Sequence, residues 1–241
     1  AWAAVAVLGL DLLAFAQAPK SAWARPEFLT DAPELASRAK ALAPGTRILH
    51  TEPILHRWSR SLLETEEDYL LMKDLLAPSY GMAFGLSEVS NLQTLRLAAA
   101  ERYRLRLAEP GAPRELADWA GIGLIIGVSE GEGRVSRGSV RVTANPTSRQ
   151  RLFIPDPSLG KVDILGYRPG TATARATLTR PSDLVFSETH HPGWTASIDG
   201  RKAPLEKWQD TFMSVKVPAG DHEVVFDYSP WSFWRGLAAT S

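Results

Sequence analysis

One short stretch concentrates the residue types that could do chemistry. Residues 186–204 read FSETHHPGWTASIDGRKAP and hold two adjacent histidines, a tryptophan, a glutamate and an aspartate. Histidine and carboxylate groups are common zinc ligands, so His190, His191 and Asp199 are the candidates for the metal site of a hydrolase. Adjacent side chains on an extended backbone point to opposite sides, however, and the chain has no HExxH spacing. We therefore expect no metal site and interpret the histidines as residues of a turn.

The same stretch carries two turn signals. Asp199-Gly200 separates two strand-like runs, which predicts a type I′ hairpin because both turn residues need positive φ. Pro192-Gly193 predicts a second turn directly before Trp194. The polar residues of the stretch are therefore expected to belong to a β-hairpin and its loops.

Aromatic side chains are a better indication of binding. An aromatic face suits the apolar C–H face of a pyranose, so Tyr80, Tyr103, Trp194 and Trp208 are candidates for stacking on sugar rings. Packing in the protein core is the alternative for each of them.

The composition excludes several classes of function. The 241 residues include no cysteine, which rules out disulfides, a thiolate nucleophile and a cysteine-ligated metal centre. Lys and Arg total 27, as do Asp and Glu, so no excess positive charge favours nucleic acid as a partner. P-loop, GxGxxG and GxSxG motifs are absent from the sequence. We therefore expect neither a cofactor nor a nucleic-acid partner for this chain.

The first half of the chain must supply helices separated by short strands. Residues 30–45, TDAPELASRAKALAPG, predict a helix with Asp31 as N-cap and Glu34 as its capping-box partner. Thr65 caps a second predicted helix, whose first turn is acidic. A buried apolar strand, GIGLIIGV, is expected at 121–128. This alternation predicts a small α/β layer.

The second half changes to the period of strands. Short runs separated by Gly, Pro, Asn or Asp favour an antiparallel β-sandwich. These runs are SVRVTAN, QRLFI, KVDILGY, TATARATLT, DLVFSET, WTASI, TFMSVKV and DHEVVFDY. In the fourth run, Ala172, Ala174, Ala176 and Leu178 are expected to share the inner face.

The two ends of the chain have the composition of membrane-helix ends. AWAAVAVLGLDLLAFAQA is an apolar run broken only by Asp11. SPWSFWRGLAATS places Trp231, Phe233, Trp234 and Arg235 together, as in an aromatic belt at a membrane surface. A buried terminal helix with a hydrophobic tail strand is the alternative. We expect a fragment of a polytopic membrane protein.

The predicted fold class is therefore α+β: a small N-terminal α/β layer, then an antiparallel β-sandwich, with membrane-helix remnants at both ends. The expected parts are the end of a spanning helix at 1–18, an α/β subdomain at 19–128, a linker or long hairpin at 129–138, a sandwich at 139–230 and the start of a spanning helix at 231–241.

The sandwich half resembles a known family. Its last strands carry Pro192-Gly193-Trp194, then Asp199-Gly200, Pro218-Ala219-Gly220 and the run His222 to Tyr228. A proline and the F-x-x-G of residues 233–236 follow. This order is similar to the C-terminal segment of the YfhO-type bacterial membrane proteins.

The resemblance implies a polytopic protein similar to GT-C glycosyltransferases. Such enzymes move a sugar from a polyprenyl-phosphate donor onto a cell-envelope glycan acceptor outside the bacterial cytoplasmic membrane. Their catalytic acid lies in an early loop between membrane helices, so no catalytic residue is expected here. The chain would be an extracytoplasmic domain that shapes acceptor binding. The expected substrate-binding residues are Tyr80, His190, His191, Trp194, Trp208 and Asp210.

Two other functions stay open. One is a structural or partner-docking domain that orders neighbouring membrane proteins without contacting sugar. The other is a secreted metallohydrolase that uses His190, His191 and Asp199.

Overall fold

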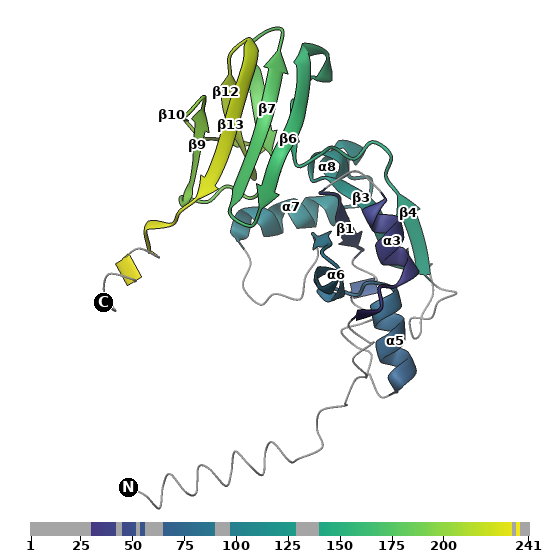
Figure 1. Ribbon diagram of the computed structural model, residues 1–241. Coiled ribbons are helices and arrows are strands. Elements are labelled where there is room, and N and C mark those ends of the chain that lie inside the picture. Colours follow the sequence, from purple (N-terminus) through teal and green to yellow (C-terminus); the bar gives the residue numbers. More distant parts are fainter. Residues whose placement is uncertain are drawn as a thin grey trace, which may run out of the picture. The chain divides into compact units, whose positions relative to one another are not determined.

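A computed structural model gives the architecture of the chain (Figure 1). It describes residues 30–41, 45–51, 54–55, 65–89, 97–128, 140–232 and 235–236. The chain divides into two units, Ala1–Ala32 and Pro33–Ser241, and the second unit is the one described below. The predicted membrane-helix end at 1–18 and the predicted linker at 129–138 lie outside the described residues, as does most of 231–241.

The first sheet has four strands in the order β2-β1-β3-β4. The strands are β1 (Arg47–His50), β2 (Ser87–Glu88), β3 (Ile122–Val128) and β4 (Val140–Ala144). Strand β1 pairs in parallel with β2 and β3. The apolar run predicted at 121–128 forms β3, which is buried as expected for a central parallel strand. Strand β4 was expected in the sandwich but pairs antiparallel with β3, because β3 has a second edge whose backbone groups need partners.

Five helices accompany this sheet among the described residues. They are α3 (Glu34–Lys40), α5 (Glu66–Asp74), α6 (Tyr80–Ala83), α7 (Ala98–Ala108) and α8 (Arg114–Trp119). Thr65 caps α5 as predicted, in a capping box completed by Asp68. The predicted cap of α3 differs: the extended residue Pro33 occupies the N-cap position and no side chain caps the helix, so Asp31 lies two residues too early.

The second half folds into two antiparallel sheets, in the orders β10-β9-β13-β7-β6 and β11-β12-β8-β5. The strands are β5 (Leu152–Phe153), β6 (Gly160–Arg168), β7 (Thr171–Leu178), β8 (Ser182–Phe186), β9 (Trp194–Ile198), β10 (Arg201–Ala203), β11 (Glu206–Trp208), β12 (Phe212–Val217) and β13 (Gly220–Tyr228). The predicted α+β class with antiparallel, sandwich-like sheets is confirmed.

Side-chain alternation builds the core between these two sheets. Ala172, Ala174 and Ala176 of β7 are fully buried, as their period of two predicts. Their small side chains leave room for Phe186 and Phe226, whose ring centroids lie 5.1 Å apart. The sandwich is therefore held together by apolar packing rather than by its polar loops.

A separate cluster joins the first sheet to the sandwich. Tyr103 of α7 packs on Phe212 of β12, with ring centroids 4.8 Å apart. Its hydroxyl donates a hydrogen bond to the carbonyl oxygen of Leu116 in α8 at 2.6 Å. These contacts fix α7 against the start of β12. No helix within the described ranges is both long and apolar enough to cross a bilayer.

Candidate functional site

The predicted hairpin turn at Asp199-Gly200 is confirmed. Asp199 has φ 51° and Gly200 has φ 75°, so both turn residues have the positive φ that a type I′ turn requires. Asp199 also holds His222, with its Oδ2 2.7 Å from Nδ1, and accepts a hydrogen bond from the Glu223 amide at 2.9 Å. The hydrogen bond between Asp199 and His222 is the main cause that raises the pKa of His222. The aspartate therefore serves the turn and the neighbouring strand.

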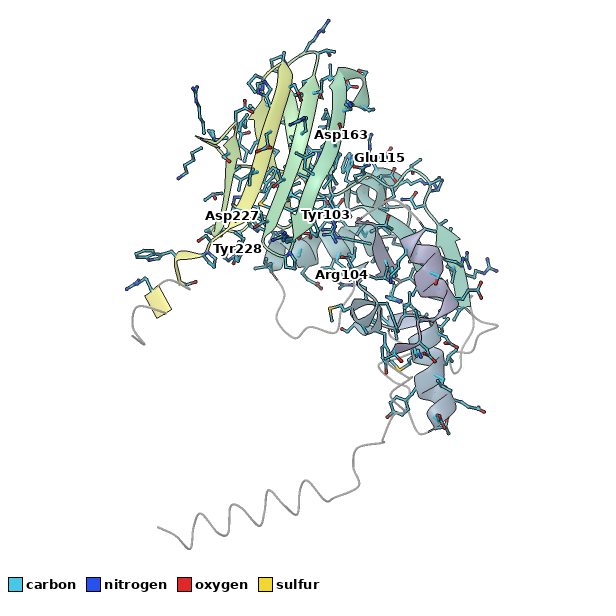
Figure 2. The ribbon with its side chains drawn as sticks, in the orientation of Figure 1. Tyr103, Arg104, Glu115, Asp163, Asp227 and Tyr228 are labelled. Carbon is cyan, nitrogen blue, oxygen red and sulfur yellow. The ribbon has the colours of Figure 1, made fainter. Side chains whose placement is uncertain are left out.

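Two of the predicted contact residues, His191 and Trp194, meet at the end of β13, where Figure 2 labels Tyr228. The Tyr228 hydroxyl lies 3.2 Å from Nδ1 of His191, and its ring lies 5.1 Å from that of Trp194. Trp194 also meets Phe186 edge-on at 5.5 Å, so its ring packs on the sandwich core. At Gly193, a Cβ atom would come within 2.7 Å of the Tyr228 ring. The turn is therefore packed tightly onto the end of β13.

His190, Trp208 and Asp210 meet around the hairpin between β11 and β12. The His190 amide donates to the carbonyl oxygen of Thr211 at 2.7 Å, which ties the histidine loop to this hairpin. Trp208 meets Trp119 edge-on, with centroids 4.9 Å apart, and is half-buried. Asp210 is exposed and has φ 57°. Burial is the main cause that lowers the pKa of His190.

Tyr80 belongs to another part of the structure. It is the first residue of α6 and is half-buried, and burial raises its pKa. The structure therefore brings five of the six predicted contact residues to the sandwich loops and places Tyr80 elsewhere.

A cavity of about 320 Å³ lies next to those loops. It lies between α7 and the segments that follow β8 and precede β12. Its described lining residues are Arg47, Glu88, Val89, Leu97, Ala100, Glu101, Arg104, Ala120, Ser187, Glu188, Thr189, Thr211 and Phe212. The predicted residues His190 and Asp210 are each next in sequence to a lining threonine, but none of the six predicted residues lines the cavity.

A buried ion cluster forms one wall of this cavity. Arg47 is 8% exposed and donates to the Ala120 carbonyl oxygen at 2.6 Å. It also donates to both oxygens of Ser187 and, at 2.8 Å, to Oε1 of Glu188. Arg151 pairs with the same Oε1, and burial is the first cause that lowers its pKa. One carboxylate oxygen therefore serves two buried guanidinium groups.

Glu88 of β2 also lines the cavity, and its protonation differs from that of an ordinary surface carboxylate. Its two oxygens accept hydrogen bonds from the Ser79 and Gly81 amides at 2.8 and 2.9 Å. Those bonds favour the charged form, but burial outweighs them and raises the pKa of Glu88 to about 7. Glu88 is therefore expected to carry a proton for part of the time near neutral pH.

The α7 face of the cavity carries a closed ion pair. Arg104, labelled in Figure 2, donates from Nε and Nη2 to the two oxygens of Glu101 at 2.9 and 2.7 Å. This bidentate pair spans one turn of the helix and is partly buried. The sequence alone did not predict Arg47, Glu88 and Arg104 as residues of a site. The one feature that could have indicated them is the position of each charged residue beside an apolar residue in the sequence.

The metal-binding alternative finds no support in the described part of the chain. There, no three His, Asp or Glu side chains gather closely enough to hold a metal ion. His191 lies against Tyr228, whereas Asp199 is engaged with His222 and the Glu223 amide. His190, His191 and Asp199 are thus parts of different local structures.

Comparison with known proteins identifies the sandwich region. Residues 161–240 match the model of the family described as bacterial membrane protein YfhO. No curated protein and no solved structure matches the chain significantly. The match covers β6 from its second residue, strands β7 to β13, the loop after β8 that carries Glu188 and His190, and the turn before β12 that carries Thr211. The segment from residue 161 to residue 240 is therefore similar to the YfhO family of bacterial membrane proteins.

Proposed function

We propose that this chain is the extracytoplasmic part of a polytopic, GT-C-like membrane glycosyltransferase, and that it shapes the binding of a cell-envelope glycan acceptor. The sugar donor would be a polyprenyl phosphate, and the catalytic residues would lie in other parts of the protein. The match to a bacterial membrane protein family supports the membrane part of this proposal.

The cavity beside α7 is the observation that carries the proposal. It has a size suited to a small ligand, and residues of β1, β2, α7 and the loops before and after the sandwich strands line it. Charged pairs, hydroxyl groups and apolar side chains all line it, which is the mixture that a sugar ring requires. Weak contacts of this kind suit a polymer that must bind, move and leave.

The structure changes which residues are the best candidates for contact. Trp194 and Trp208 pack on buried rings, so we assign them a supporting role. His190 and Asp210 flank the lining residues Thr189 and Thr211, so the proposed acceptor contacts are at these two positions.

Titration of the whole chain with polysaccharide prepared from the cell envelope of the source bacterium tests the proposal. Asp210→Asn removes a charge but keeps a residue type that tolerates positive φ, and we expect it to weaken binding about threefold. Asp163→Asn is the matched control, because Asp163 is an exposed residue of β6 that is not next in sequence to any lining residue of the cavity. A folded chain that binds no polysaccharide would contradict the proposal and favour the docking domain.

A further inference from the structure

We propose that the cavity beside α7 binds one uncharged pyranose ring and discriminates against phosphate-bearing groups. This inference rests on the proposed function for the polymer to which the ring belongs. The size, the unpartnered polar atoms and the charge of the cavity each support it.

The size of the cavity sets the first limit. Its volume of about 320 Å³ is at the lower end of the roughly 300–1,000 Å³ typical of small-ligand sites. One monosaccharide unit suits such a space, whereas a folded peptide segment does not. Val89, Leu97 and Phe212 supply apolar surface for the C–H face of a ring.

Three polar atoms on the lining have no hydrogen-bond partner among the described residues. Oε1 of Glu188 accepts the bonds from Arg47, Arg151 and Tyr167, which leaves Oε2 without one. The hydroxyl groups of Thr189 and Thr211 make none either. Thr211 is only 5% exposed as a residue, but its hydroxyl is not one of the buried atoms that lack a partner, so the hydroxyl oxygen is accessible from the cavity that Thr211 lines. The hydroxyl groups of a sugar would satisfy all three atoms, because each can donate and accept.

The charges of the cavity exclude an anionic ligand. A phosphate group is normally held by guanidinium groups that are free to face it. Here Arg104 is held by Glu101, and Arg47 is held by Glu188 and Ser187. A phosphate that entered the cavity would instead meet the oxygens of carboxylates, and like charges repel at short range.

Two substitutions test the site, each with a matched control. Thr211→Val removes the lining hydroxyl at nearly constant shape, and Ala100→Phe fills the cavity from α7. Thr143→Val on β4 and Ala108→Phe at the exposed end of α7 make the same changes outside the lining. Thermal unfolding of each variant checks whether the fold is kept.

The probes are methyl α-glucopyranoside, methyl N-acetyl-α-glucosaminide and inorganic phosphate, titrated by NMR against the whole chain. We expect one of the two glycosides to bind in the millimolar range, without competition from phosphate. Thr211→Val should weaken it at least fivefold and Ala100→Phe at least tenfold, while the controls change it less than twofold.

Different results would overturn the inference and the proposed function. If phosphate displaces the glycoside or binds more tightly, the cavity is an anion site and the inference is overturned. If cell-envelope polysaccharide binds equally to wild type and to Ala100→Phe, the inference is overturned and the proposed function stands. If the folded wild-type chain binds neither glycoside nor polysaccharide, both are overturned.

Discussion

Glu188 accepts hydrogen bonds from three side chains, and no motif of the sequence predicts this role. Its Oε1 atom receives Arg47, Arg151 and Tyr167, and the Arg151 guanidinium also lies over the Tyr167 ring at 4.9 Å. Arg47 and Arg151 come from the first sheet and from the segment before β5, so one carboxylate links three parts of the chain. Buried guanidinium groups are tolerated only with such a partner.

Removing this carboxylate should therefore be costly. We expect Glu188→Ala to lower the free energy of unfolding by about 3–5 kcal/mol, because it leaves two buried cations without their negatively charged partner. Glu206→Ala is the control: its partner Lys216 is exposed and 3.8 Å away, so a loss of at most about 1 kcal/mol is expected. Urea unfolding of both variants measures the difference, and equal losses would show that the cluster is not a structural centre.

Glu88 gives the cavity a pH dependence. Burial raises its pKa from 4.5 to about 7, so the folded protein binds more protons than the unfolded chain between these values. Stability is therefore expected to fall as the pH rises from about 4.5 to about 7, by on the order of 1–2 kcal/mol after solvent screening. Carboxyl ¹³C NMR of Glu88 measures its pKa directly, with the exposed Glu206 as reference. A Glu88 pKa near 4.5 would contradict this account.

At the scale of elements, short-range sequence signals predicted the structure well. Thr65 and Asp68 form a capping box, with the Thr65 amide 3.0 Å from Asp68 Oδ2 and the Asp68 amide 3.3 Å from Thr65 Oγ1. The hairpin turn at Asp199-Gly200 and the inward alanines of β7 were likewise predictable. Each of these features depends on residues a few positions apart.

The capping box predicts a measurable contribution to stability. Thr65→Ala removes the side-chain acceptor of the Asp68 amide, so the first turn of α5 loses one of its few satisfied donors. We expect a loss of about 1 kcal/mol in the free energy of unfolding, and Thr65→Ser should recover most of it. A loss below about 0.3 kcal/mol in chemical denaturation would mean that the cap contributes little.

The pairing of β4 and the cavity could not be predicted in this way. The SVRVTAN run has the same alternation as the sandwich strands, and only the free edge of β3 decides its place. The cavity brings together residues such as Arg47, Glu101, Glu188 and Thr211, which lie far apart in the sequence. No spacing rule connects such positions, because they meet only after the sheets and α7 have packed.

At the scale of the molecule, one shared core connects the first sheet with the sandwich. Tyr103, Leu116 and Ile122 pack in one cluster with Phe153, Val185 and Phe212. Tyr103–Phe212 and Trp119–Trp208 are its closest ring contacts, with centroids 4.8 and 4.9 Å apart. Residues 33–241 form one compact unit, which agrees with a core that crosses between the two halves.

This shared core predicts that the two halves unfold together. Tryptophan fluorescence reports on the surroundings of eight tryptophans, among them Trp119 and Trp208 in the shared core, and far-UV circular dichroism reports on all helices and strands. We expect coincident transitions in urea, as for a single cooperative unit. Two separated transitions, with the sandwich more stable, would show that the halves are independent.

The mapping of a bound sugar tests the central claim most directly. Backbone amide shifts can be followed across the whole chain while an oligosaccharide from the cell envelope is titrated. The account predicts that the largest shifts occur at Ala100, Thr189 and Thr211, around the cavity beside α7. Shifts confined to the outer face of the five-stranded sheet, around Thr195 and Val225, would contradict it.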